Sequence, residues 1–192
     1  STASIKTLVI DVTEGGAMTR KIVRALKVKD GLIESDVSED VVKIGVVERH
    51  RGTGHIGKGF VKGFGIKRGA IASTIGHDAH NLVVLGVRSG DMAFAANVVS
   101  DIDGGLVAVD SGHVLARLPL PIAGLMSDRP ADEVASRAAA LDEAARKLGS
   151  KLEKPFLSLS FMPLAVIPEL RITDRGLVDV NKFNLTGIYV PD

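Results

Sequence analysis

The sequence contains no cysteine and no tryptophan, and aromatic residues make up only 4% of its 192 positions. Without cysteine the chain can form neither a disulfide framework nor a thiolate metal site, which suits the reducing cytoplasm, where we expect the protein to work. Its apolar runs are short, as in LVVLGV at 82–87, so neither a signal peptide nor a membrane-spanning helix is expected. The core must therefore be built from aliphatic side chains.

An excess of charge of one sign is also missing, because 24 basic residues stand against 23 acidic ones and the net charge is +1. Such a balance gives no field that would attract nucleic acid or an anionic membrane, and neither is expected as a partner. A length of 192 residues suits one well-buried core, so we expect a single domain over 1–192. Because the chain begins with Ser1 and not with methionine, we expect an excised or processed segment of a longer protein.

Short runs of Val, Ile and Leu bounded by Gly, Pro and Asp predict many strands. The candidate strands are 5–12, 20–28, 41–49, 70–75, 81–87, 105–110, 113–117, 156–161 and 185–190. Apolar residues at intervals of three and four predict a helix over 131–148, with Leu141 facing inward and Gly149 ending the helix. The ion pairs expected on its outer face are Asp142 with Arg146 and Glu143 with Lys147.

A second apolar stripe predicts a helix over 90–103, with Ser89 as its cap and Gly104 at its end. Together with the strands at 81–87 and 105–110, it predicts a β-α-β unit with a right-handed crossover. The residues at 110–113 predict a hairpin turn into the next strand. The expected fold is α+β, with mixed sheets flanked by helices and 1–19 as a candidate connecting segment.

A polar cluster follows the predicted strand at 70–75. Its members are His77, Asp78, His80 and Asn81. Polar groups at the end of a buried strand are held rigidly yet can face a cleft, so one interpretation is contact with a substrate or a metal. A catalytic metal usually has three protein ligands, and only part of such a set is visible here. The other interpretation is a structural turn whose Asp and Asn satisfy backbone N–H groups.

The segment Glu48, Arg49 and His50 leads into a glycine-rich run at 52–65. GTGHIGKGF lacks the spacing and the final Ser or Thr of a phosphate-binding Walker loop, so a nucleoside triphosphate is not expected. We favour a loop that helps to close a cleft. The alternatives are a backbone that glycine brings close to a neighbouring domain, and a solvated loop.

Three longer blocks give the chain a family resemblance. They read VVERHRGTGHIGKGFVKGFGIKRGAIASTIGHDAHN at 46–81, LPLPIAGLMSD at 118–128, and PFLSLSFMPLAVIPELRITDRGLVDV at 155–180. In content and order they resemble the carboxy-terminal domain of the adenine deaminases, and the match is collinear from about residue 20 onward. Ala79 departs from the pattern, because that family commonly has serine there.

The resemblance implies an amidohydrolase-type, metal-dependent enzyme that converts adenine and water into hypoxanthine and ammonia. It also implies a pair of divalent ions, manganese or iron, held by histidines and carboxylates of a barrel. A barrel of that kind needs roughly 250 residues by itself, so we expect no such barrel here. The five histidines contain no His-x-His pair, and no metal is expected in this chain.

We therefore assign no residue of this chain as catalytic. The substrate-pocket candidates are His77, Asp78, His80 and Asn81, and the loop candidates are Glu48, Arg49 and His50. The expected role is to wall the active-site mouth, exclude water and support assembly. The expected partners are adenine, the enzyme's own amino-terminal barrel and further copies in a homo-oligomer. The alternatives are a non-catalytic purine-binding or oligomerisation module, and an independent metallohydrolase built on His77, Asp78 and His80.

Overall fold

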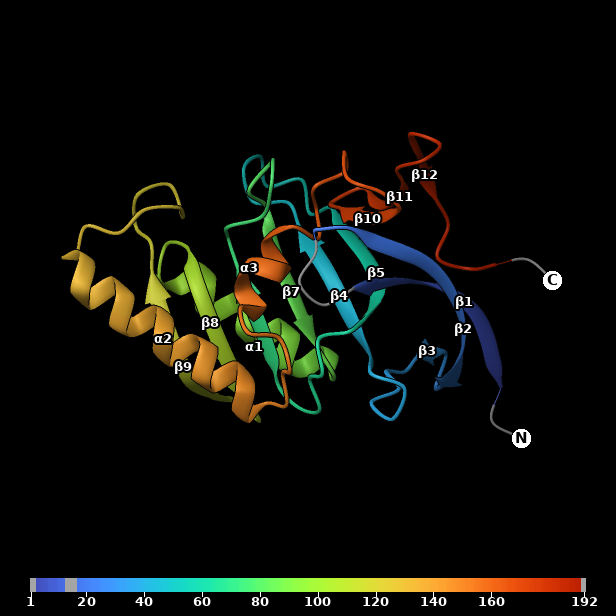
Figure 1. Ribbon diagram of the computed structural model, residues 1–192, viewed down its shortest axis with the longest axis horizontal. Helices are drawn as coiled ribbons and strands as arrows, with labels where there is room; N and C mark the ends of the chain where they lie inside the picture. Colours follow the sequence, from blue (N-terminus) through green and yellow to red (C-terminus); the bar gives the residue numbers. More distant parts are fainter. Residues whose placement is uncertain (1–2, 13–16, 191–192) are drawn as a thin grey trace.

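The computed structural model describes residues 3–12 and 17–190. Its strands are β1 (Ser4–Val12), β2 (Thr19–Lys29), β3 (Leu32–Ile33), β4 (Val41–Val47), β5 (Ile56–Lys62), β6 (Ala70–Ser73), β7 (Leu82–Gly86), β8 (Gly105–Asp110), β9 (His113–Pro119), β10 (Leu170–Thr173), β11 (Gly176–Asp179) and β12 (Asn184–Thr186). Its helices are α1 (Ser89–Asp101), α2 (Ala131–Lys147) and α3 (Pro155–Ser160). Figure 1 shows their arrangement.

Most strands belong to one open sheet in the order β3-β2-β1-β5-β4-β7-β6-β8-β9. The pair β1 and β5 is parallel, whereas every other neighbouring pair in this sheet is antiparallel. A second sheet has the order β10-β11-β12, and neither sheet closes into a barrel. The predicted α+β fold with mixed sheets is confirmed.

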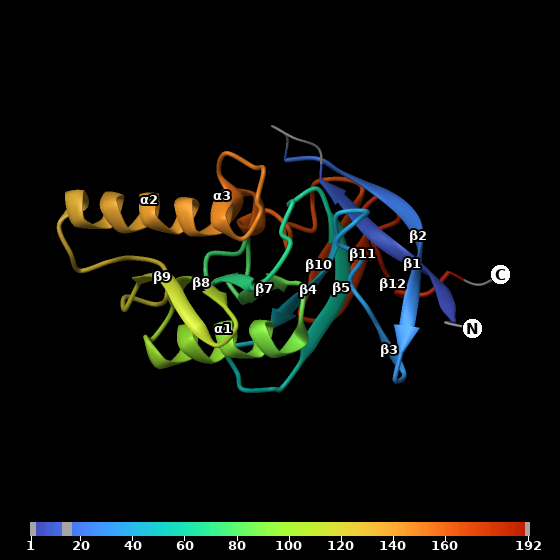
Figure 2. The same cartoon turned by 90° about the horizontal axis from the view of Figure 1, so that it is seen from below.

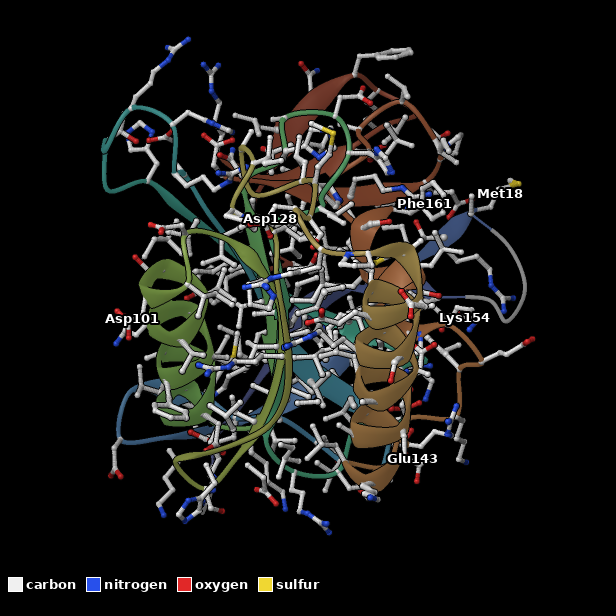
Figure 3. All side chains as sticks on the ribbon, turned by 90° about the vertical axis from the view of Figure 1, so that its left-hand side faces the viewer. Met18, Asp101, Asp128, Glu143, Lys154 and Phe161 are labelled. Carbon is white, nitrogen blue, oxygen red and sulfur yellow. The ribbon has the colours of Figure 1, made fainter. Side chains whose placement is uncertain are left out.

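Helices cover both faces of the large sheet, with α1 on one face and α2 and α3 on the other (Figure 2). Side chains fill the space on each side of the sheet between α1 and α2 (Figure 3). The larger core lies under α2 and α3 and includes Leu141 and Phe156, whereas a smaller core under α1 includes Ala95 and Val99. The sheet is therefore the middle layer of three.

The prediction of α2 is confirmed, because Leu141 is only 1% exposed and Gly149 ends the helix with φ at +113°. The expected ion pairs differ. Arg146 reaches Glu143 at 2.9 Å, three residues away, and Asp142 instead pairs with Lys154 at 3.0 Å. These two pairs form in place of the predicted i,i+4 pairs. Lys154 lies close enough to Asp142 to form the ion pair predicted for Arg146.

The predicted β-α-β unit consists of β7, α1 and β8. Strands β7 and β8 run parallel to each other, because β6 lies between them and is antiparallel to both. The hairpin turn is also confirmed, since Asp110 pairs with His113 and the two residues between them have positive φ. Ser89 is not the cap. It is the first residue of α1, and its hydroxyl lies 3.5 Å from the ammonium of Lys43.

Three other predictions are corrected. The segment 156–161 is not a strand, because Pro155 begins the helix α3 there. Part of the glycine-rich run is not a loop, because Ile56–Lys62 forms β5 in the middle of the sheet. The last predicted strand is shorter than 185–190, since β12 ends at Thr186 and the chain then runs beside β1.

Part of the candidate connecting segment 1–19 belongs to the large sheet. Ser4–Val12 forms β1, which pairs along its whole length with β2 and lies parallel to β5. Residues 1–2 and 13–16 of this segment lie outside the described residues. An ion pair of 2.6 Å between Lys21 of β2 and the buried Asp179 of β11 ties the two sheets together.

Candidate functional site at the end of the large sheet

Three loops meet at one end of the large sheet (Figure 1). The first is 48–55 between β4 and β5, the second is 74–81 between β6 and β7, and the third is 120–128 after β9. Arg49 joins them. Its Nε donates to the carbonyl oxygen of His80 at 2.6 Å, and its Nη2 donates to that of Ala123 at 2.8 Å. One guanidinium therefore fixes two loops relative to the first.

Gly124 completes this junction. With φ at +73°, it adopts a conformation that favours glycine, and a Cβ there would lie only 3.0 Å from Nη2 of Arg49. The hydroxyl of Thr74 donates to the carbonyl oxygen of Gly124 at 2.6 Å and accepts from the N–H of Gly105 at 2.9 Å. The loop 120–128 is thus bonded to the strands as well as to Arg49.

Glu48 organises the loop that carries Arg49. Its carboxylate accepts hydrogen bonds from the N–H groups of His50 at 2.6 Å, Arg51 at 2.8 Å and Thr53 at 3.0 Å. These bonds, the one from Thr53 above all, lower the pKa of Glu48 to about 2. At neutral pH the group is an acceptor that shapes the loop and not a proton donor.

The two histidines of the polar cluster lie edge to face, with ring centroids 5.5 Å apart. The ring of His77 also lies 5.4 Å from that of Phe161, and the backbone N–H of His77 donates to the carbonyl oxygen of Ser160 at 2.9 Å. Burial, and then the neighbouring His77, lowers the pKa of His80, so its neutral form is favoured at pH 7. A neutral imidazole can donate at one nitrogen and accept at the other, and Nδ1 of His80 lies 3.4 Å from the backbone N–H of Gly76, from which it accepts.

The remaining candidates have different environments. Asn81 is buried, and its side-chain oxygen accepts from the N–H of Arg49 at 3.3 Å. His50 is exposed, with Nε2 2.7 Å from the carbonyl oxygen of Ala79. Asp78 is exposed beside them. The structure therefore brings together all the residues that the sequence singled out. Asn81 and Arg49 connect loops and Glu48 shapes its own loop. His77 and His80 are half-buried, whereas His50 and Asp78 are exposed.

No group of three or more His, Cys, Asp or Glu side chains in the described residues is arranged to hold a metal ion. His77, Asp78 and His80 therefore do not form the set of three protein ligands that a catalytic metal site usually has. The metal pair that the family resemblance implies does not fit the residues described here.

Sequence reasoning missed Arg171 in β10. It is fully buried, and its guanidinium donates to the backbone carbonyl oxygens of Ile167 at 2.7 Å, Phe161 at 3.0 Å and Ala17. Burial lowers its pKa to about 10, so the charge persists at neutral pH. Arg171 thus fixes the segment after α3 that carries Phe161, against which His77 packs. The only sequence signal for this role is a basic residue between two large apolar ones, LRI at 170–172.

The profile of a family described as the adenine deaminase C-terminal domain matches residues 16–184. The chain belongs to that family. The resemblance drawn from the blocks at 46–81, 118–128 and 155–180 is thereby confirmed. All the loops of the candidate site fall inside the matched range, so their arrangement belongs to an adenine deaminase C-terminal domain.

Three relatives show how much of a longer protein this domain represents. The chain is 48% identical over 184 residues to a protein named adenine deaminase from Moorella thermoacetica, covering 96% of the chain and 31% of the relative. The identity to that of Desulfatibacillum aliphaticivorans is 50% over 187 residues, covering 97% and 32%. For Brucella anthropi it is 53% over 182 residues, covering 95% and 32%. The chain spans about a third of the length of these relatives.

None of the helices in the described part of the chain combines the length and the apolar character needed to cross a bilayer.

Proposed function

We propose that this chain is part of an enzyme that hydrolyses adenine to hypoxanthine and ammonia. In this reaction the oxygen of water bonds to C6 of the ring, the bond from C6 to the amino nitrogen breaks, and that nitrogen leaves as ammonia after taking up a proton. The relatives named adenine deaminase support the proposal, because they match the chain almost from end to end. The metal pair, manganese or iron, would be held by the other two thirds of such an enzyme.

The role proposed for this domain is to cover the mouth of the active site. The observation that carries it is the position of Arg49, whose hydrogen bonds to His80 and Ala123 hold three loops in one rim. A rim fixed in this way excludes water, and its loops lose little conformational entropy when substrate binds because they are already ordered. In this role, His77, His80 and His50 on the rim offer hydrogen-bonding groups to a purine.

Two exposed apolar side chains lie on the same rim. Ile122 and Met126, in the loop that carries the Arg49 partner Ala123, are 46% and 58% exposed. Exposed apolar side chains next to a fixed polar cluster support docking against the catalytic part of the enzyme. They also keep the alternative of an oligomerisation module open. The alternative of an independent metallohydrolase has no support, since His77, Asp78 and His80 are not arranged as a metal-binding group in the described residues.

The test compares adenine deamination by the longer enzyme and by this chain, each supplied with manganese or iron and followed by ammonia release. The proposal expects turnover by the longer enzyme and none above background by the chain. Metal analysis of the same samples should find the metal in the longer enzyme. Turnover at enzyme-like rates by the homogeneous chain would overturn the assignment of the chemistry to the rest of the protein. The homo-oligomer and the cytoplasmic location remain predictions.

A further inference from the structure

A groove of about 710 Å³ lies on the α1 face of the large sheet. Its floor is formed by β4 and β5, and one wall is formed by α1. The other wall is formed by β3 with the turn before it and by Ile188 and Tyr189. In Figure 2, α1 and β3 stand on either side of β5. The side chains that give the groove its apolar surface include Leu32, Val47, Ile56, Phe60, Val84 and Met92.

The groove exists because this face of β4 and β5 lacks a cover. Helix α1 packs on β6, β7 and β8. Gly45 in the middle of β4 adds no side chain on this side, and a Cβ there would meet Val84 only at 3.5 Å and Ile56 at 4.0 Å, which is ordinary contact. Ile56 and Leu32 therefore remain 50% and 62% exposed. On the opposite face of the same strands, the side chains are buried in the larger core.

Two lysines give the groove a charge. Lys43 and Lys58 lie on the floor among apolar side chains, and the described lining contains no acidic residue. Lys43 is partly neutralised from outside, because its ammonium is 3.6 Å from the carboxylate of Glu34. Lys58 is exposed and, within the described residues, makes no hydrogen bond or ion pair. The groove therefore combines an apolar floor with one uncompensated cation, and Asn97 and Ser89 supply hydrogen-bonding groups at its wall.

We propose that this groove binds a small amphipathic anion, a molecule with an apolar body and one carboxylate or phosphate group. Small-molecule sites usually enclose roughly 300–1,000 Å³, are lined mainly by apolar side chains and orient the ligand with a few polar groups. The groove has these properties, and its lysines select a negative head group by charge complementarity. The site lies on the α1 face, away from His77 and His80, and does not depend on the deamination chemistry.

The test uses decanoate, below its micelle-forming concentration, as the probe. Binding to this chain and to the longer enzyme is measured by calorimetry, together with decanol and decyltrimethylammonium, which share the apolar tail. Decanoate should bind to both proteins with one site, and the other two should bind at least tenfold more weakly. Equal binding of all three compounds would overturn the role of the lysines. Binding to the chain but not to the longer enzyme would show instead that the rest of the protein covers the groove.

Two variants place the ligand. Gly45→Leu fills the floor, and the space around its Cβ allows it without backbone strain, so decanoate binding should be lost while the melting temperature is kept. Lys58→Glu should weaken binding at least tenfold, whereas Lys147→Glu on α2, an exposed lysine on the other face of the sheet, should not change it. Unchanged binding in Gly45→Leu would overturn the site. If Gly45→Leu changed the sedimentation coefficient of the protein but kept decanoate binding, the groove would be a contact between copies of the chain and not a ligand site.

Discussion

The Nε of Arg49 donates a hydrogen bond of 2.6 Å to the carbonyl oxygen of His80, and the same guanidinium reaches Ala123 at 2.8 Å. Two loops that are far apart in the sequence therefore share one cation. Arginine suits this position because its planar group offers several donors in fixed directions, which a lysine ammonium does not.

We predict that Arg49→Ala lowers kcat/KM for adenine in the longer enzyme by about tenfold or more, because the rim loses its shape. Arg49→Lys should restore little, since one ammonium cannot replace both bonds. The matched control is Arg51→Ala, an exposed arginine in the same loop. Steady-state kinetics check the prediction, and full activity in Arg49→Lys would show that only the charge matters.

The pH dependence of Glu48 provides a second prediction. Its pKa falls from 4.5 to about 2 in the folded protein, so the bonds that shape the loop are fully stabilising above pH 4.5 and are lost as the pH falls through about 2. The carboxyl resonance of Glu48 and the amide resonance of Thr53 should titrate together with that low midpoint. In Glu48→Gln the titration at Thr53 should vanish. A midpoint near 4.5 would mean that the loop is not held by Glu48 in solution.

A third prediction concerns the packing of α2. Leu141 is 1% exposed in the larger core, so Leu141→Asp should cost several kcal/mol, about 3 or more, because it buries an unpaired charge. Arg146→Ala removes only a pair with Glu143 in which both side chains are about half exposed, and should cost under about 1 kcal/mol. Denaturation midpoints of the two variants measure the difference. Equal midpoints would place the wrong face of α2 against the sheet.

The sequence predicts α2 from the period of its apolar residues, which puts Leu141 on the buried face. It predicts β1, β2 and β8 from short aliphatic runs bounded by turn residues. The sequence does not predict β5, because Gly57 and Gly59 interrupt its pattern of strand-forming residues. The structure gives the reason: a Cβ at Gly57 would lie 1.7 Å from the carbonyl oxygen of Thr173, where the second sheet crosses β5. This close approach depends on a contact between segments over a hundred residues apart.

The polar residues of the site are predictable as a group, because they follow buried strands, but their partners are not. Arg49 binds backbone carbonyls of His80 and Ala123, and a carbonyl oxygen carries no signature in the sequence. The run at 156–161 shows a related limit, since a short apolar run fits a strand or a buried helix equally well. Pro155 at the first helical position resolves it in favour of α3.

The central claim is that His77 and His80 face the substrate at the mouth of an active site whose chemistry lies elsewhere in the enzyme. Its most direct test is kcat/KM for adenine in His77→Ala and His80→Ala of the longer enzyme, with metal content and melting temperature measured on the same samples. The control is His113→Ala, an exposed histidine at the start of β9. We predict a loss of about tenfold or more in each variant, equivalent to ~1.4 kcal/mol of transition-state stabilisation, with metal content unchanged. Normal turnover per folded molecule together with a loss of ~1–3 kcal/mol in stability would contradict the account and make both histidines structural turn residues.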